Sequence, residues 1–428
     1  MKRKKVLWLL PLLCVLLPIA INGSEPGKEA FNVNRFPFGP ENSKWELVTI
    51  PINSIFSSAL GKTISCSDFV GEISKSRIVL VGESHTADIH HKMQLKIVQS
   101  LFELGKPVIL ALEMFPPSAN ECLNGFVSGA FSEEDFLTQS HWFKIWGHNF
   151  RYYKPIFDYA RQKKIPLFGI NIPHSLASKV RMIGIEGLSP EERNGLPLLD
   201  KTSKEHRFLV NAMLDGIGAL APETFDHLYD AQCLWDSAMG EGAIKLSREY
   251  PMATVVVLAG SGHVAYNLGI PKIIQNRSDF SFSSVLAVDI EQMEKKSDKN
   301  KSTKTKSDSY QFHLGKDDGI PQIPSEIVSR GLANFLIGVP QEDKEKFPTF
   351  GIGLKGDPKV GIFLSMIFPG SMGEKMGLQK GDKILEINGK IFETVEEMKK
   401  FLSLMNWGDG VSFLVLRQGK RKKIRFVL

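Results

Sequence analysis

The sequence predicts an α/β fold in which helices cover both faces of a mostly parallel sheet, followed by a smaller second domain. Between residues 77 and 289, short runs rich in Val, Ile and Leu alternate with amphipathic stretches. A lysine-rich segment without apolar side chains, residues 294–308, then interrupts the chain. The length of 428 residues is also too great for one hydrophobic core, which favours two domains.

Five apolar runs are predicted to be strands buried on both faces, because polar and apolar side chains do not alternate in them. They cover Arg77–Val81, Val108–Leu112, Pro166–Ile170, Thr254–Ala259 and Ser284–Asp289. After the first run, apolar residues recur at helical spacing, namely at Ile89, Met93, Ile97 and Leu101. Strand–helix alternation implies parallel strands, and ligand sites in such sheets gather at the carboxyl ends of the strands.

The N-terminus is typical of an export signal, with basic residues 2–5 followed by an apolar run from Val6 to Ile21. That run is short for a membrane span and contains two prolines. Cys14 leaves a lipoprotein open, although the large Leu13 before it argues against lipid attachment. We therefore expect an extracytoplasmic protein of the periplasm or cell envelope, and an uncleaved anchor leaves membrane association open.

The formal charge of +6 does not indicate a nucleic-acid partner. Four of the positive charges lie in residues 2–5, so about +2 remains without that segment. A nucleic-acid-binding domain would carry a clustered basic patch, and none is evident. The three cysteines beyond the signal show neither a CxxC pair nor zinc-finger spacing, which favours free thiols.

Composition divides the chain into four parts. The predicted ranges are a signal peptide at 1–23, an α/β domain at 40–292, a flexible Lys/Ser-rich linker at 293–325, and a C-terminal domain with an N-terminal extension at 326–428. The linker is expected to be solvated, because it cannot bury enough apolar surface to offset the entropy lost on ordering.

Polar side chains follow four of the predicted strands. Glu83 and His85 follow the first strand, Glu113 the second, Asn171 the third and His263 the fourth. Two of these ends share the pattern Gly-x-x-His, in which glycine permits a sharp turn and a close approach to a ligand. Such a set can bind a divalent metal such as Mn, Co or Zn through His85, Glu113 and His263. It can also act in acid–base catalysis, with Glu83 included, or the histidines can simply satisfy loop backbone.

Two further segments are predicted to border this site. Residues 141–159 are dense in aromatic side chains, which can clasp a flat ligand and offer a Tyr or His to a haem iron, or can pack as core over the sheet. In the second segment, Gln232 lies on an apolar helical stripe with Asp236 one turn further on. Because a buried amide needs partners, both side chains are predicted to support the site from behind.

Together these residues resemble the ChaN-like haem-binding uptake family within the Tiki/TraB superfamily. The resemblance covers about residues 78–273 and rests on Gly82-Glu83-Ser84-His85, His90-His91, Glu113-Met114-Phe115, Trp146, Tyr153-x-Pro155, Asn171-x-Pro173, Gln232, Trp235-Asp236 and Gly260-x-Gly262-His263. It implies haem as the leading cofactor, with tyrosine contributing to its ligation. The implied haem contacts are Tyr153, His85, Trp146, Gln232, Asp236 and His263.

Other members of the superfamily are metal-dependent proteases built around paired Gly-x-x-His motifs. The resemblance therefore leaves an alternative, a metal-dependent hydrolase or peptidase with Glu83, His85, Glu113 and His263 as catalytic residues. A homodimer also remains open. A third hypothesis is a scaffold without catalysis that only binds partners.

The end of the chain resembles the PDZ modules of bacterial periplasmic proteases, which implies a partly open β-barrel with helices. The loop that receives a peptide carboxylate is matched by Phe350, Gly351, Ile352, Gly353 and Leu354. A C-terminal or extended peptide would add as a strand beside this loop, facing the predicted helix 395–404. The module is then expected to recruit peptides to the first domain or to localise it, unless it serves assembly alone.

Overall fold

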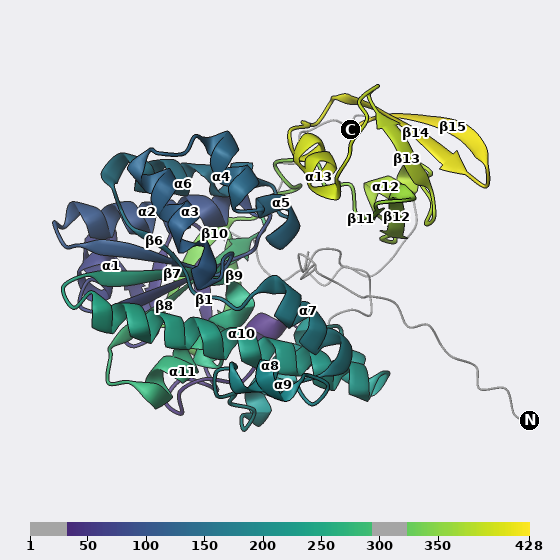
Figure 1. The fold of residues 1–428 in the computed structure, drawn as a ribbon. Coiled ribbons are helices and arrows are strands. Elements are labelled where there is room, and N and C mark those ends of the chain that lie inside the picture. The colour runs from purple at the N-terminus through teal and green to yellow at the C-terminus, as the bar shows by residue number, and fades with distance from the viewer. Residues whose placement is uncertain (1–31, 293–322) are drawn as a thin grey trace, which may run out of the picture.

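The computed structural model describes residues 32–292 and 323–428, which fold into two domains (Figure 1). The predicted signal peptide and most of the predicted linker lie outside these residues. Within the described ranges, no helix is both long enough and apolar enough to cross a membrane. The three cysteines in the same ranges are all free.

The first domain is built on an eight-stranded sheet with the order β3-β2-β10-β8-β4-β7-β5-β6. The central strands run parallel, and every residue of β4, β5 and β7 is buried. Their bounds are β4 Ile78–Glu83, β5 Val108–Leu112, β6 Leu167–Gly169, β7 Thr254–Gly260 and β8 Phe282–Ile290. All five predicted strands are confirmed. The α/β fold class with its mostly parallel sheet is therefore as predicted.

Segments far apart in the sequence complete this domain. Strand β10 (Phe335–Pro340) pairs in parallel with β8, and antiparallel β2 (Ile55–Ser57) and β3 (Lys62–Ile64) extend the sheet. Strand β9 (Ser325–Ser329) pairs with β1 (Leu47–Pro51) in a separate ribbon. The predicted boundary at residue 326 is therefore wrong. The chain returns to the first domain after residue 322 because the apolar run of β10 is buried beside β8.

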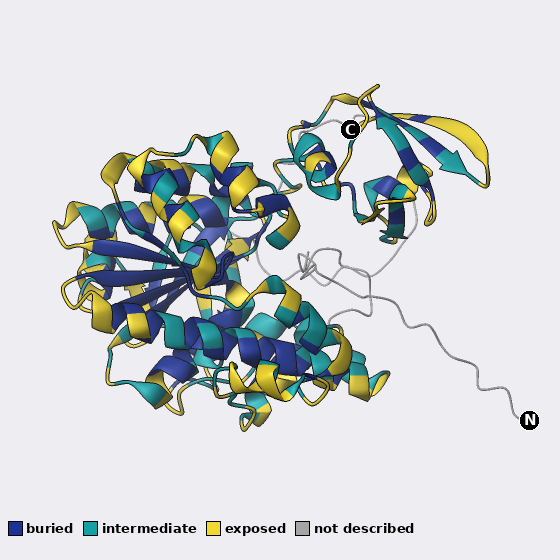
Figure 2. Ribbon diagram, in the orientation of Figure 1, coloured by how far each residue is buried: buried dark blue, intermediate teal, exposed yellow. Residues whose placement is uncertain are grey.

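Two helical layers cover the sheet, as predicted (Figures 1 and 2). Side chains of a strand alternate between faces, so Val79 and Val81 pack into one core cluster while Ile78 and Leu80 pack into another. The first layer contains α1 Cys66–Ile73, α2 Asp88–Glu103, α3 Asn120–Ser128, α4 Glu133–Gln139, α5 Trp142–Ile145 and α6 Phe150–Lys163. The second contains α7 His174–Ile183, α8 Pro190–Asn194, α9 Lys204–Met213, α10 Pro222–Glu249 and α11 Ile270–Arg277.

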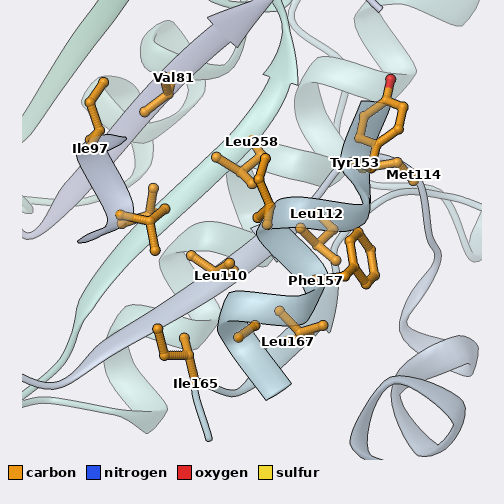
Figure 3. Packing of buried hydrophobic residues seen from close by; sticks show 14 of the residues in the cluster. Val81, Ile97, Leu110, Leu112, Met114, Tyr153, Phe157, Ile165, Leu167 and Leu258 are labelled. Atoms are coloured by element: carbon orange, nitrogen blue, oxygen red, sulfur yellow. The ribbon is translucent and has the colours of Figure 1, made fainter. Parts of the chain in front are cut away.

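Helix α2 shows how the pattern of apolar residues fixes packing. Met93, Ile97 and Leu101 are buried against the sheet, whereas Lys92 and Lys96 are exposed on the opposite face. The core on this side continues into aromatic residues of α6, as Figure 3 shows. Burying one large aliphatic or aromatic side chain stabilises a fold by about 1.5–3 kcal/mol, so this face holds α2 and α6 firmly.

The second domain has a five-stranded antiparallel sheet with the order β11-β12-β13-β14-β15. The bounds are β11 Ile352–Asp357, β12 Gly361–Ile367, β13 Lys383–Ile387, β14 Gly410–Arg417 and β15 Lys420–Val427, with helices α12 Met372–Lys375 and α13 Val395–Ser403. Phe413, Leu364 and Met398 lie in its core. Strand β11 forms one edge of the sheet, where a peptide strand can be added.

Candidate functional site

The site lies at the carboxyl ends of β4, β5 and β7. Glu83 is the last residue of β4 and pairs in register with Gly260, the last residue of β7. Glu113 follows β5, and His263 ends the short helix η5 (Ser261–His263) that follows β7. Gly82 permits this arrangement, because a Cβ there would lie only 2.3 Å from Leu286 Cδ2.

His263 lies between two carboxylates. Its Nδ1 is 2.6 Å from Asp236 Oδ1, and its Nε2 is 3.2 Å from Glu113 Oε1. Burial alone would lower the pKa of His263, but the two carboxylates raise this pKa to about 10. Burial likewise opposes ionisation of Glu113 and Asp236, but the His263 imidazolium holds both carboxyl pKa values below their ordinary range. At neutral pH the three groups therefore form a buried charged unit.

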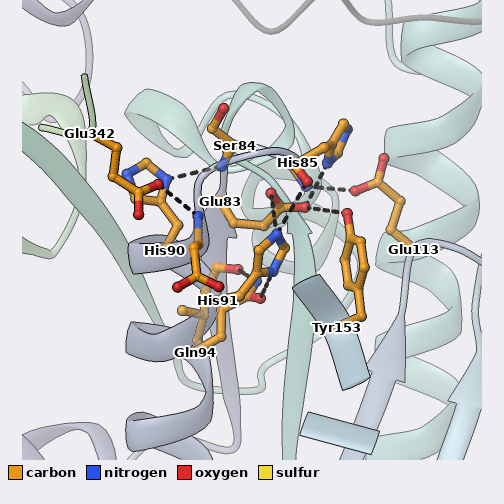
Figure 4. A network of polar contacts seen from close by, with 12 residues as sticks. Glu83, Ser84, His85, His90, His91, Gln94, Glu113, Tyr153 and Glu342 are labelled. Atoms are coloured by element: carbon orange, nitrogen blue, oxygen red, sulfur yellow. Dashed lines mark hydrogen bonds and ion pairs between the residues drawn. The ribbon is translucent and has the colours of Figure 1, made fainter. Parts of the chain in front are cut away.

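A second ionisable pair lies beside the first (Figure 4). His85 Nδ1 is 2.6 Å from Glu83 Oε1. Burial opposes protonation of His85, but Glu83 and Glu113 raise its pKa. The two halves of the site meet over Gly260, where a Cβ would lie 3.1 Å from His85 Cε1 and 3.6 Å from Glu113 Oε2. The Gly260 N–H donates to Glu113 Oε2 at 2.5 Å.

Further side chains support these pairs from below. The Tyr153 hydroxyl donates to Glu83 Oε1 at 3.5 Å, and Tyr153 is fully buried. His91 Nε2 lies 3.8 Å from Glu83 Oε2, and burial lowers the pKa of His91. Gln232 Nε2 lies 2.9 Å from His263 Nδ1, and Asn171 Nδ2 donates to the Glu113 carbonyl at 2.9 Å. The carboxylates and imidazoles are thus fixed in position before any ligand arrives.

A cleft with an enclosed volume of about 80 Å³ opens above the charged groups, and its space is about 610 Å³ when the open mouth is included. Ligand sites commonly enclose about 300–1,000 Å³, so a ligand of that size would occupy the open mouth of the cleft as well as its enclosed part. His85 lies on its floor, within 4.7 Å of the rings of Trp146 and His148. The other lining residues are Glu113, Met114, Ile145, Asn171, Ile172, His174, Arg181 and Trp235.

His148 is a lining residue that can donate a lone pair. Burial lowers the pKa of His148 well below its ordinary value, and the neighbouring His85 lowers it further. Its imidazole is therefore neutral at pH 7. The backbone carbonyl of His148 accepts a hydrogen bond from Trp142 Nε1 at 2.7 Å, which fixes the turn that carries it.

Most of the predicted site residues converge in space. Glu83, His85, Glu113 and His263 line or underlie the cleft. Gln232 and Asp236 lie behind His263, and Trp146 lines the cleft wall. The predicted roles of these side chains in catalysis or cofactor binding stay predictions.

Tyr153 is buried beneath the cleft, and its predicted contact with haem stays a prediction. It was expected to reach a haem ligand, but it has no exposed surface and its ring packs 4.4 Å from that of His91. Burial raises the pKa of Tyr153 well above its ordinary value, which disfavours the phenolate that would bind iron. In this geometry Tyr153 supports Glu83 and does not line the cleft. His90 also turns away from the site, with its Nε2 3.0 Å from Asp289.

Several polar residues of the site, His174 among them, do not stand out in the sequence. His148 and Arg181 line the cleft, and His206 Nε2 lies 3.3 Å from Asp236 Oδ2. His148 belongs to the aromatic segment 141–159, and that segment is the only sequence signal that points to it. No local pattern marks Arg181 or His206, because long-range packing alone brings their helices to the site.

The predicted metal centre lacks a matching ligand geometry. Within residues 32–292 and 323–428, no group of three His, Cys, Asp or Glu side chains is placed to hold a metal ion. The carboxylates bind the histidines instead, and a protonated imidazole offers no lone pair to a metal. The metal hypothesis therefore gains no support from the arrangement of these side chains.

The predicted peptide-binding segment occupies the edge of the second domain. Phe350 is buried in the core against Phe413, and Gly351 adopts a left-handed conformation with φ of 60°. Ile352, Gly353 and Leu354 begin β11 and pair on one side only, with β12. Peptide binding by this segment stays a prediction.

The fold and site define a class of protein: an α/β domain with paired carboxylate–histidine groups at its strand ends, joined to an antiparallel β domain. Residues 69–274 match the family described as haem-binding uptake, Tiki superfamily, ChaN. Residues 341–416 match the PDZ domain family. The chain therefore carries a ChaN-like domain followed by a PDZ domain, as the sequence predicted.

Similarity to individual proteins is more limited. A putative zinc metalloprotease of Campylobacter jejuni is 40% identical over 77 residues, which are 18% of this chain and 19% of that protein. This chain therefore spans about a fifth of that relative. A structure of ChaN of Campylobacter jejuni with cofacially bound haem is 19% identical, covering 66% of this chain and 95% of that one at a TM-score of 0.48. An HtrA-type protease with a bound decapeptide is 20% identical over 18% of this chain and 28% of its own, at a TM-score of 0.18.

Proposed function

We propose that this protein is an exported haem-binding protein whose ChaN-like domain holds haem in the cleft above His85. The observation that carries the proposal is the lining of that cleft, where the neutral imidazole of His148 lies beside the indole of Trp146. The family description of residues 69–274, which names haem binding, supports the same conclusion.

The lining residues fit haem chemically. Trp146 and Trp235 offer flat apolar surfaces, and the Arg181 guanidinium lies 5.7 Å from the Trp235 ring, where a cation can meet a propionate carboxylate. Bound haem would supply an iron atom to which a neutral imidazole nitrogen can donate a lone pair, and His148 would be the residue that holds it. Among the lining residues, His148 is the imidazole that burial keeps neutral, whereas the pKa of His85 is raised by Glu83.

Titration with haemin tests this proposal. The full chain should shift the Soret band, and His148→Ala should weaken haemin binding by about tenfold or more, as the loss of one metal ligand or its support does. Tyr153→Phe is the matched control on the next helix. It should leave the Soret shift unchanged, because Tyr153 is buried beneath Glu83. Absence of a Soret shift in the wild type, or equal affinity in His148→Ala, contradicts the proposal.

Hydrolysis is a second candidate function, favoured by the buried charged unit around His263. In this role the Glu113 carboxylate would take a proton from an attacking water, and the imidazolium of His263 or His85 would stabilise the developing oxyanion. A peptide held by the PDZ domain is then a candidate substrate. Ester or peptide cleavage that disappears in Glu113→Gln, at unchanged stability, would support this function. Elemental analysis of wild type and the double variant His85→Ala/His263→Ala tests whether a divalent metal takes part.

Export and peptide recruitment complete the proposal. Residues 1–23 have the pattern of a signal peptide, and the PDZ domain is of a kind that binds peptides. Mass spectrometry of the mature N-terminus tests the first point, since an intact residue 1 contradicts cleavage. An array of C-terminal peptides with free and amidated ends tests the second.

A further inference from the structure

Helix α13 has two contacts that matter for the PDZ domain. One side borders β11 closely, since a Cβ added to Gly356 of β11 would lie 3.3 Å from Val395 Cγ2. The other side meets the ChaN-like domain at α4 and α5 (Figure 1). There Glu396 Oε2 lies 3.2 Å from His141 Nδ1, and Lys400 forms an ion pair with Glu134. The helix that flanks the predicted peptide groove is thus also a docking element.

The C-terminal end of α13 is held by the N-terminal end of α6. The Arg151 guanidinium donates to the carbonyls of Ser403 and Met405 at 2.7 Å each and to Asn406 Oδ1 at 2.8 Å. Asn149 Nδ2 donates to the Ser403 carbonyl at 2.9 Å. Cationic and N–H donors at the end of a helix satisfy carbonyls that have no partner within the helix. These bonds cross the domain boundary and fix the position of α13.

The segment connecting the domains is also held in place. The Arg151 guanidinium carbon lies 3.8 Å from the centre of the Phe347 ring. The backbone N–H of Phe347 donates to the Tyr152 hydroxyl at 3.3 Å. Lys346 Nζ lies 2.8 Å from Asp88 Oδ1 at the start of α2. The PDZ domain is therefore docked, with little freedom to withdraw from the ChaN-like domain.

Residues 141–149, which we call the α5 wall, lie between α13 and the cleft. On the outer side, Lys399 of α13 lies close to Gly147, since a Cβ added to Gly147 would lie 3.5 Å from Lys399 Nζ. On the inner side, Trp146 and His148 pack on His85 and line the cleft. A displacement of α13 toward the ChaN-like domain would therefore press on the residues proposed to hold the ligand.

A peptide strand added to β11 must fit between β11 and α13. Strand β11 is bonded to β12 along its other edge, so a peptide that widens the groove loads α13, whose bonds to Arg151 and Asn149 carry the load to residues 141–149. We propose that a peptide in the PDZ groove moves α13 against the α5 wall, so that peptide binding and ligand binding in the cleft oppose each other. The part of this proposal that concerns haem rests on the proposed function. The mechanical coupling between the groove and the wall does not.

Hydrogen exchange of the full chain tests the coupling without any cleft ligand. The probe is a pool of decapeptides with randomised last four residues and a free carboxylate, and the control is the same pool with amidated ends. The free pool should slow exchange in β11 and change exchange in residues 141–149 by about fivefold or more, the lower end of typical coupling between sites. Unchanged exchange in the wall, or no protection of β11, overturns the proposal.

Two variants separate coupling from unrelated effects. Arg151→Ala removes the bonds to the end of α13, so the pool should still protect β11 while its effect on residues 141–149 disappears. Lys423→Ala, exposed on the distant strand β15, should behave as the wild type. A wall response that persists unchanged in Arg151→Ala overturns the route through α13.

Haemin titration with and without the peptide pool then tests whether peptide binding weakens ligand binding in the cleft. Haemin affinity should fall by about fivefold or more, and haemin should weaken peptide binding by the same factor, because coupling between two sites is reciprocal. If haemin does not bind while the exchange effect is present, the proposed haem function fails and the coupling stands. If haemin binds with equal affinity at saturating peptide, the coupling fails and the haem function stands.

Discussion

Replacing Asp236 with alanine should destabilise the ChaN-like domain strongly. Asp236 is buried on α10, where it lies 2.6 Å from His263 and 3.3 Å from His206. Its removal leaves a buried imidazolium with one carboxylate instead of two. Breaking a buried ion pair by removing one partner costs about 3–5 kcal/mol, and we expect a loss of that size in the free energy of unfolding at pH 7.

The loss should depend on pH in a defined direction. The folded-state pKa of His263 is raised to about 10, so its stabilising effect is complete below its unfolded value and disappears as pH rises through about 10. The folded-state pKa of Asp236 is lowered, so its contribution is present above its unfolded value and disappears as pH falls through the folded one. The difference between wild type and variant should therefore be greatest between about pH 5 and pH 6.5, and it should decrease as pH rises from there through about 10.

Urea denaturation followed by tryptophan fluorescence measures this difference, because Trp142 and Trp235 report on the ChaN-like domain. The matched control is Asp226→Ala on the same helix. Asp226 is 56% exposed and paired with Arg207, so its loss should cost less than about 1 kcal/mol. A loss below about 1 kcal/mol in Asp236→Ala, or one that does not vary between pH 7 and pH 10.5, would refute the charged unit described above.

Two further substitutions test the packing of each domain. Gly82→Ala places a Cβ 2.3 Å from Leu286 Cδ2 and 3.0 Å from Ser261 Cα, and should destabilise the ChaN-like domain by about 1–3 kcal/mol in urea. A neutral effect would mean that the Leu286 side chain and the backbone at Ser261 can both move aside. Asp382→Ala removes a carboxylate that is 1% exposed and bonded twice to Arg417 at 2.7 Å. It should lower the unfolding free energy of the PDZ domain by about 3–5 kcal/mol, measured by urea denaturation of that domain, and an equal shift in the ChaN-like domain would contradict a local effect.

The sequence predicted the central sheet well, because strands buried on both faces leave continuous apolar runs. The convergence of His85, Glu113 and His263 followed from the rule that strand ends in a parallel sheet share one edge. The parallel order of the strands was therefore sufficient to predict that these residues lie close together. The second pair, Glu83 with His85, is brought together by the local turn after β4 alone, because the two residues are only two positions apart in the sequence.

Other features depend on long-range packing that periodicity does not record. The run Phe335–Pro340 is as apolar as β8, but nothing local shows that it pairs there across the lysine-rich segment. The direction of Tyr153 was equally inaccessible, because an aromatic residue in a dense aromatic segment can face a core or a cleft. Arg151 carries no motif, and its role at the end of α13 appears only when both domains are folded.

The return of β10 to the sheet has a consequence for proteolysis. A protease that cuts the chain between residues 292 and 323 would not release the PDZ domain, because β9 and β10 would remain paired with β1, β2 and β8. The nicked protein should migrate as one species in native gel filtration and as two fragments only after denaturation. Conversely, a chain that stops at residue 292 would leave β8 as an apolar sheet edge open to aggregation.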